Sequence, residues 1–212
     1  MTRYLKYAAS FLVVPILLCA CINLKKPQNR IEYYTLEYDR PAMAGLAPLS
    51  SVLRIERFGV APSYNSSRII YRDRTFKRDA YAYHRWHANP GDLVTCFLAR
   101  DMEEAGLFRA VLPHDSGFPA THIVAGSVDE FLEWDGDEQW KALLVISITL
   151  MAENEPDIAE KIVFQKRYRA EKLCGSKNPR SLAEAMSRAM AELSEKIILD
   201  IHGRLKGERQ LR

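Results

Sequence analysis

Residues that could support metal or acid–base chemistry occur at three places in the sequence. His84 and His87 are three residues apart; on a strand these positions face opposite sides, so their imidazoles cannot share one metal ion. Residues 135–138 form a short acidic tract that lacks the ligand series of a calcium loop. The adjacent acids Asp129 and Glu130 are expected to be solvated. Because the sequence also contains no nucleophile elbow or phosphate-binding glycine loop, we predict no metal, no cofactor and no enzymatic activity.

A different chemistry, covalent lipidation, is indicated near the N-terminus. Arg3 and Lys6 provide a positive start, and residues 8–18 form an apolar run that is too short to span a bilayer. This run ends in Leu-Cys-Ala-Cys at residues 18–21, which resembles the lipobox of bacterial lipoproteins. Lipid transfer needs a thiol nucleophile, and the peptidase needs a small residue directly before it.

Cys21 is therefore the predicted lipidation site, with signal-peptide cleavage between Ala20 and Cys21. Cys19 fits less well, because Leu18 would then occupy the position that requires a small residue. Ile22 is not the aspartate that retains lipoproteins at the inner membrane of enteric bacteria. We therefore predict a chain anchored by its lipid on the periplasmic side of the outer membrane.

Three segments follow from this assignment. Residues 1–20 are a predicted signal peptide, residues 21–30 a lipidated polar tether, and residues 31–212 a single periplasmic domain. Removing the signal peptide takes away two cations and no acid, so the formal charge falls from +3 to +1. A chain with so little excess positive charge is not expected to bind nucleic acid.

The mature chain contains two further cysteines, Cys96 and Cys174. An oxidising periplasm would allow them to form a disulfide, but no feature of the sequence brings their Cα atoms within bonding distance. Cys96 lies among Val94, Phe97 and Leu98 on an apolar helix face, so a buried free thiol is the alternative.

Apolar periodicity predicts an α+β fold. Asn89 and Pro90 start a helix that Gly106 ends, and Ser181 starts a second helix through a capping box with Glu184. Turn residues between the last three predicted strands indicate an antiparallel meander. We therefore expect a mostly antiparallel sheet with two helices packed on one face. The predicted strands cover residues 31–38, 52–60, 68–72, 79–86, 122–134, 140–152 and 157–173, with a short strand or extended link at 107–112.

The central part of the chain resembles a known family. Residues 68–72, residues 81–86, Asn89-Pro90 and residues 106–108 together resemble the ABC-type transport auxiliary lipoproteins. Residues 33–36, Tyr-Tyr-Thr-Leu, also fit the mature start of that family. The likeness extends from about Tyr33 to the final helix and is strongest over 68–111. Asn89 departs from the proline or small residue that the family favours.

The resemblance implies a non-enzymatic accessory lipoprotein of an ABC transporter of the MCE (mammalian-cell-entry) type, which moves lipids between the inner and outer membranes. The implied partners are an MCE-domain protein and its ABC permease and ATPase. The alternative, from a different class, is a lipoprotein that supports outer-membrane assembly or activates a peptidoglycan synthase.

The sequence also suggests a surface for such a partner or for a second copy in a homo-oligomer. Tyr81, Tyr83 and Arg85 alternate along a predicted strand, and these residue types are enriched at interface hot spots. Small Ala82 beside bulky Trp86 indicates that the opposite face of the strand points inward. We therefore expect Tyr81, Tyr83 and Arg85 to face outward, with packing in the core as the alternative.

Overall fold

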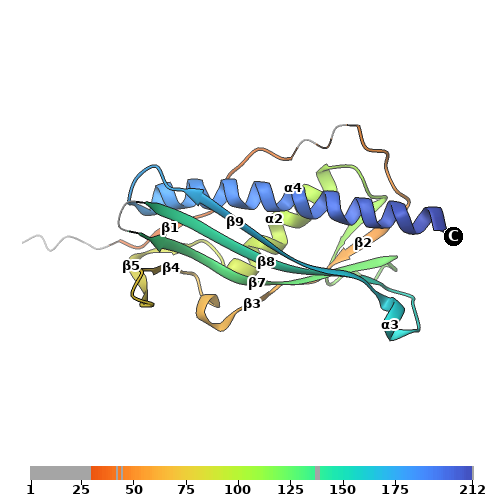
Figure 1. Cartoon of the computed structure of the whole chain (residues 1–212), viewed down its shortest axis with the longest axis horizontal. Coiled ribbons are helices and arrows are strands. Elements are labelled where there is room, and N and C mark those ends of the chain that lie inside the picture. Colours follow the sequence, from red (N-terminus) through yellow and green to blue (C-terminus); the bar gives the residue numbers. More distant parts are fainter. Residues whose placement is uncertain (1–29, 42, 44, 137–138, 212) are drawn as a thin grey trace, which may run out of the picture. The chain divides into compact units, whose positions relative to one another are not determined.

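The computed structural model describes residues 30–211 apart from 42, 44, 137 and 138, and residues 31–212 form one compact unit (Figure 1). The predicted signal peptide, the cleavage site at Ala20 and Cys21, and the tether up to residue 29 lie outside the described residues. Within the described part of the chain, no helix has both the length and the hydropathy needed to cross a bilayer.

The described unit contains nine strands, three α-helices and one 3₁₀ turn, named η2. In chain order they are β1 (Glu32–Tyr34), β2 (Val52–Ile55), β3 (Gly59–Val60), η2 (Pro62–Tyr64), β4 (Arg68–Arg72), β5 (Arg78–Trp86), α2 (Pro90–Glu104), β6 (Ala110–Pro113), β7 (His122–Asp135), β8 (Trp140–Ala152), α3 (Ile158–Lys161), β9 (Ile162–Leu173) and α4 (Pro179–Leu211).

The long strand β7 organises the sheet. Along one side it pairs with β8, which in turn pairs with β9, and both pairings are antiparallel. Along its other side the short strands β2, β3 and β4 pair with it one after another, all parallel to it. Strands β1 and β5 are also parallel, as are β2 and β6. The sheet is therefore mixed, and the prediction of a mostly antiparallel sheet is wrong.

The helices and the sheet share one apolar core. The apolar stripe predicted on α4, whose seven residues recur every three or four positions, is buried, and each of the seven is at most 4% exposed. Helix α2 adds Leu93, Val94, Leu98 and Met102 to the same cluster. The members from α4 include Leu182, Met186, Ala189, Leu193, Ile197, Ile201 and Leu205.

The ends of the helices agree only in part with the sequence. Asn89 caps α2 by accepting a hydrogen bond from the Gly91 amide at 3.0 Å, and Gly106 follows the helix with φ of +63°, as predicted. The predicted capping box of α4 is wrong. Asn178 accepts from the Ser181 amide at 2.8 Å, because the helix begins two residues earlier, at Pro179.

Candidate functional site

A buried polar pair lies on the core side of the sheet. Glu133 on β7 is 2% exposed, and the Tyr81 hydroxyl on β5 donates to its two carboxylate oxygens at 3.2 and 3.0 Å. The Tyr81 ring also meets the rings of Tyr71 and His84 edge to face, with centroids 5.4 and 5.7 Å apart. Glu133, Tyr81, Tyr71 and His84 thus form one connected group of side chains around β5.

The electrostatics of this pair favour its protonated forms. Burial raises the pKa of Glu133, and the hydrogen bond from Tyr81 offsets this shift only in part. Burial and the charge of Glu133 raise the pKa of Tyr81. Because the two groups point at each other within the core, their arrangement suits a structural hydrogen bond that fixes β5 against the sheet.

A second polar group holds the first strand at the sheet edge. The Tyr34 hydroxyl donates to Glu32 at 2.7 Å and lies 3.3 Å from Nδ1 of His84, which is also 3.3 Å from Glu32. Burial, together with the bond to Glu32, raises the pKa of Tyr34 to about 12. His84 therefore takes part in strand docking, and His87 does not join it at a common site.

The predicted partner surface on β5 is not a single outward face. Tyr81 turns to the core, Ala82 is exposed, and Tyr83 is 45% exposed, whereas Trp86 is buried as expected. The cause is a register shift against β4, where Ile70 pairs with Ala80 but Arg68 pairs with Arg85. Extra residues on β5 interrupt the alternation on which the prediction depended. Tyr83 is exposed and Arg85 is half-buried, whereas Tyr81 is half-buried with its hydroxyl turned toward Glu133.

Sequence reasoning missed Glu133 as well as the inward turn of Tyr81. The one available signal was an acid at position 133 within an apolar run, Phe-Leu-Glu-Trp, on a predicted core strand. A charged residue in such a place requires a buried partner, but the partner lies 52 positions away and could not be identified from spacing.

Cys96 and Cys174 are free thiols in the structure. Cys96 is exposed on α2, so the prediction of a buried thiol there is wrong. Cys174 follows β9 and is half-buried, and this burial raises its pKa to about 11. Among the described residues, no three His, Cys, Asp or Glu side chains come close enough to hold a metal ion.

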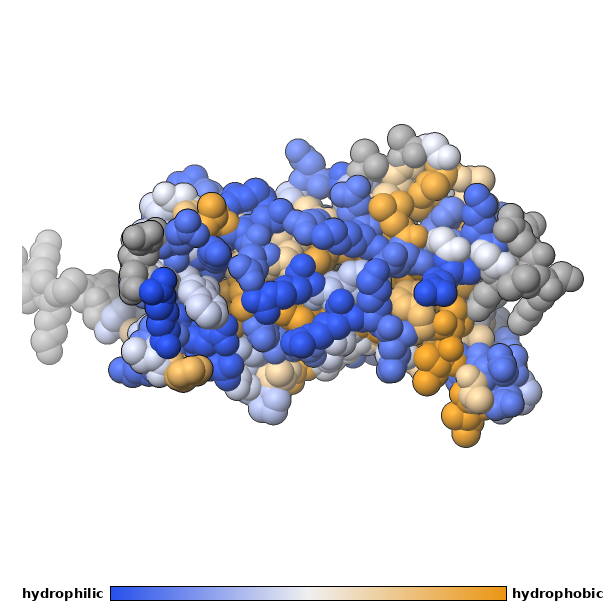
Figure 2. Space-filling view, in the orientation of Figure 1, coloured by the Kyte–Doolittle hydropathy of each residue, from blue (hydrophilic) through white to orange (hydrophobic). Residues whose placement is uncertain are grey.

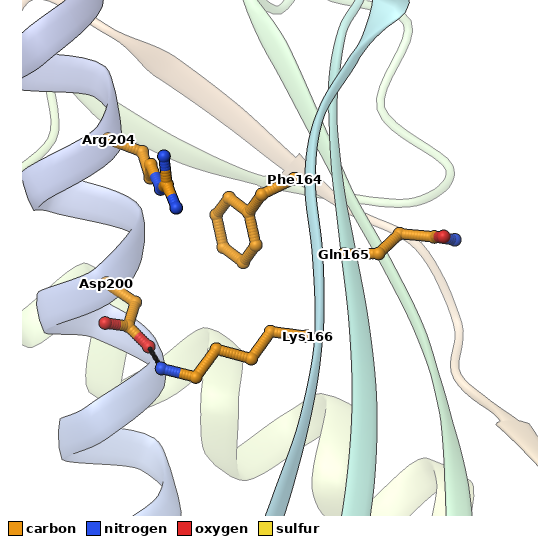
Figure 3. A pocket seen from close by; sticks show the side chains of 5 residues that line it. All are labelled: Phe164, Gln165, Lys166, Asp200 and Arg204. Atoms are coloured by element: carbon orange, nitrogen blue, oxygen red, sulfur yellow. Dashed lines mark hydrogen bonds and ion pairs between the residues drawn. The ribbon is translucent and has the colours of Figure 1, made fainter.

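A shallow pocket lies between β9 and α4 (Figure 3). Lys166 forms an ion pair with Asp200 at 2.6 Å, and the Tyr168 hydroxyl donates to the same carboxylate at 2.7 Å. Burial acts to raise the pKa of Asp200, but the bonds from Lys166 and Tyr168 hold it below its usual value. Phe164 and Lys166 face α4 in Figure 3, while Gln165 points away from it. The charges of Lys166 and Asp200 neutralise each other, and this contact joins β9 to α4. The arrangement therefore suits packing of the helix on the sheet.

Exposed apolar side chains gather at the end of the unit that carries α3 (Figures 1 and 2). Ile158 is 81% exposed and Ile162 is 47% exposed. Phe118, in the loop between β6 and β7, is 73% exposed. Its backbone carbonyl accepts a hydrogen bond from the Arg54 guanidinium at 3.3 Å. Arg54 in turn pairs with Glu153 at the end of β8, which brings this loop beside the turn that leads to α3.

The family model for the ABC-type transport auxiliary lipoprotein component matches residues 34–198. A Xanthomonas campestris protein of the DUF330 family has a similar structure, with a TM-score of 0.76 at 15% identity over 84% of this chain and 99% of that one. A Chlamydia trachomatis hypothetical protein has a TM-score of 0.53 at 11% identity over 74% of this chain and 98% of that one. These structures show a shared fold. Among curated protein sequences, none matches this chain.

Proposed function

The chain belongs to the family of ABC-type transport auxiliary lipoprotein components, and we propose that it is a non-enzymatic accessory subunit of an ABC/MCE-type system that moves lipids between membranes. The observation that carries the proposal is the extent of the family match. Residues 34–198 include all nine strands except the first two residues of β1, and more than half of α4. The family match therefore covers most of the folded unit.

The proposed anchor is a lipid on Cys21, which would hold the unit at the periplasmic side of the outer membrane. Strand β1, which Ile31 directly precedes, lies toward the end of the unit opposite α3 (Figure 1). A chain held near Ile31 therefore presents Ile158, Ile162 and Phe118 to the periplasm. Large exposed apolar side chains suit a protein contact. We assign this α3 end to the MCE-domain protein, which has to extend from the inner membrane with its permease and ATPase.

Co-purification tests both parts of this proposal. The full chain is expressed with the MCE-domain protein, permease and ATPase of the same genome, and recovered from detergent-solubilised membranes. We expect the wild-type chain to bring down the MCE-domain protein, and Ile158→Asp to lower its recovery about tenfold without changing the melting temperature. Leu199→Asp, at an exposed position on α4, is the control and should leave recovery unchanged.

The two possible failures are distinct. If the wild-type chain brings down none of the three transporter proteins, the assignment to an MCE system is wrong. If recovery is normal with both variants, the transporter assignment stands and the contact lies elsewhere, with exposed Tyr83 on β5 as the next position to substitute.

A further inference from the structure

The β4–β5 hairpin places an aromatic ring almost wholly in water. Phe76 is 95% exposed, and its φ of +63° is one that bulky residues rarely adopt. Asparagine or glycine would adopt this conformation with less strain and would expose less apolar surface. The stability of the fold therefore does not account for a phenylalanine at this position.

The hairpin around Phe76 is rich in cations. Residues 72–79, Arg-Asp-Arg-Thr-Phe-Lys-Arg-Asp, contain four cations and two acids. Asp73 is engaged locally, because it accepts hydrogen bonds from the Thr75 amide at 2.8 Å and the Thr75 hydroxyl at 2.6 Å. Lys77, next to the exposed ring, is itself exposed. The hairpin thus presents an apolar apex surrounded by net positive charge.

The adjoining end of the sheet has the same character. The register pairs connect five residues in one row across five neighbouring strands, from β5 through β4, β7 and β8 to β9, and Leu173 at the far side of the row is 55% exposed. Cations next to aromatic and apolar side chains are typical of protein surfaces that rest on a lipid–water boundary. The row consists of Arg78, Arg72, Trp134, Lys141 and Leu173.

The hairpin lies at the end of the unit where the chain enters. Strand β1 runs parallel to β5 and pairs with the last three residues of β5, so the chain approaches β1 from the side on which β5 begins, and β1, β4 and β5 lie at the same end of the unit (Figure 1). Cys21 comes ten residues before Ile31, and ten residues span at most about 35 Å. Helix α4, with 33 residues, is about 50 Å long and leads away from this end. A bilayer holding a lipidated Cys21 is therefore within reach of the hairpin end.

We propose that the β4–β5 hairpin is a membrane contact, in which Phe76 inserts between the headgroups of an anionic bilayer and the surrounding cations bind the phosphates. The proposal takes its geometry from the proposed lipidation of Cys21. An aromatic ring supplies the apolar contact of an interfacial anchor, and each nearby cation adds attraction to an anionic surface. The hairpin would thereby orient the unit on the membrane, because it adds a second point of contact to the lipid on Cys21.

Vesicle binding tests the hairpin without the lipid anchor. A fragment of residues 31–212 is used, because it forms one compact unit and every buried residue of the main hydrophobic core lies between Leu36 and Leu205. This fragment is sedimented with phosphatidylcholine vesicles that contain either no anionic lipid or 30 mol% phosphatidylglycerol, at low salt. We expect it to bind the anionic vesicles. Phe76→Asn should lower the partition coefficient about tenfold, and Lys77→Gln about fivefold.

The melting temperature of Phe76→Asn separates binding from folding. Asparagine suits the positive φ, so we expect the variant to melt at the wild-type temperature or above it. Ile158→Asn, at the α3 end where Ile158 is 81% exposed, should leave vesicle binding unchanged. Equal loss in Phe76→Asn and Ile158→Asn, or no loss in Phe76→Asn, would overturn the proposal. Because the fragment lacks Cys21, neither result depends on lipidation or on a transporter.

Photo-crosslinking then tests the contact in the complete lipidated chain. Phe76 is replaced by benzoylphenylalanine, and adducts are analysed by mass spectrometry after irradiation of intact membranes. We expect phospholipid adducts at position 76 and none when the probe replaces Ile158. Protein adducts at position 76, in place of lipid adducts, would assign the hairpin to a protein partner and refute the membrane contact.

Discussion

The hydroxyl of Tyr81 reaches the carboxylate of Glu133 across an intervening strand. Tyr81 is on β5 and Glu133 on β7, and β4 lies between them in the sheet. Tyr71 on β4 pairs with Glu133 in register, and its ring contacts that of Tyr81. The bond therefore fastens three strands together on their core side, and it does so with an ionisable group that is almost completely buried.

Glu133→Gln should change how stability depends on pH. Because burial raises the folded-state pKa of Glu133, its stabilising contribution is complete only below the unfolded value near 4.5 and is lost as the pH rises through the folded pKa. Glutamine can still accept from Tyr81 but does not ionise. Urea unfolding at several pH values should show the variant gaining stability relative to wild type from about pH 4.5 to neutrality. A difference independent of pH would contradict the assigned shift.

Leu193→Ala should destabilise the domain by about 2–5 kcal/mol, because it leaves a cavity between α4 and the sheet. Leu193 is 0% exposed. Leu199→Ala on the same helix is the matched control, since Leu199 is 40% exposed and its truncation removes little buried surface. Thermal or urea unfolding measures both. Similar losses for the two variants would mean that α4 does not bury its apolar stripe as described.

Gly91→Ala should destabilise the domain although alanine favours helices. A Cβ at position 91 would lie 2.6 Å from the carbonyl oxygen of Phe58 and 2.6 Å from a methyl group of Val60, so α2 would have to move away from β3. Gly203→Ala in α4 meets nothing within 4 Å and should stabilise by up to about 1 kcal/mol. Opposite changes in the melting temperature are expected. A stabilising Gly91→Ala would show that α2 can shift without cost.

Cys21→Ser should abolish lipidation and signal-peptidase II processing, because serine lacks the thiol nucleophile. Each buried methylene contributes about 0.8 kcal/mol, so two or three acyl chains hold the wild-type chain firmly in the membrane. Mass spectrometry of the mature N-terminus should find a modified Cys21 in the wild type. An unmodified mature start at another residue would refute the assignment. Sucrose-gradient fractionation tests the outer-membrane location separately.

The sequence predicted best what local chemistry determines. Asn89 and Gly106 mark the ends of α2, and β8 has the predicted limits because turn residues flank an apolar run. The stripe of α4 is buried as expected. Lipidation of Cys21 and the absence of catalysis remain predictions. The parallel pairing of β2, β3 and β4 with β7 was not predicted. These strands are far from β7 in the sequence, and no turn between adjacent strands indicates that they pair.

Two further errors concern α3 and β5. The strand predicted over 157–173 includes α3, which Asp157 initiates by accepting from the Ala159 amide at 2.8 Å. The outward face predicted for β5 failed at its irregular register, which depends on pairing with β4 and cannot be read from the residues of β5 alone. Consequently the candidate partner surface was the least predictable feature, while the family was recognisable from segments whose structure is regular.

Helix α4 runs the length of the unit, beginning near the hairpin end and ending near α3 (Figure 1). With the proposed membrane contact at the hairpin, its 33 residues, about 50 Å of packed helix, would make the unit a stiff lever with its pivot at the bilayer. A tilt of about 10° at the pivot would displace the far tip by about 9 Å over this length. Small changes in how the hairpin contacts the headgroups would thus produce large displacements of Ile158. The orientation of the unit on the membrane would then determine where the α3 end lies.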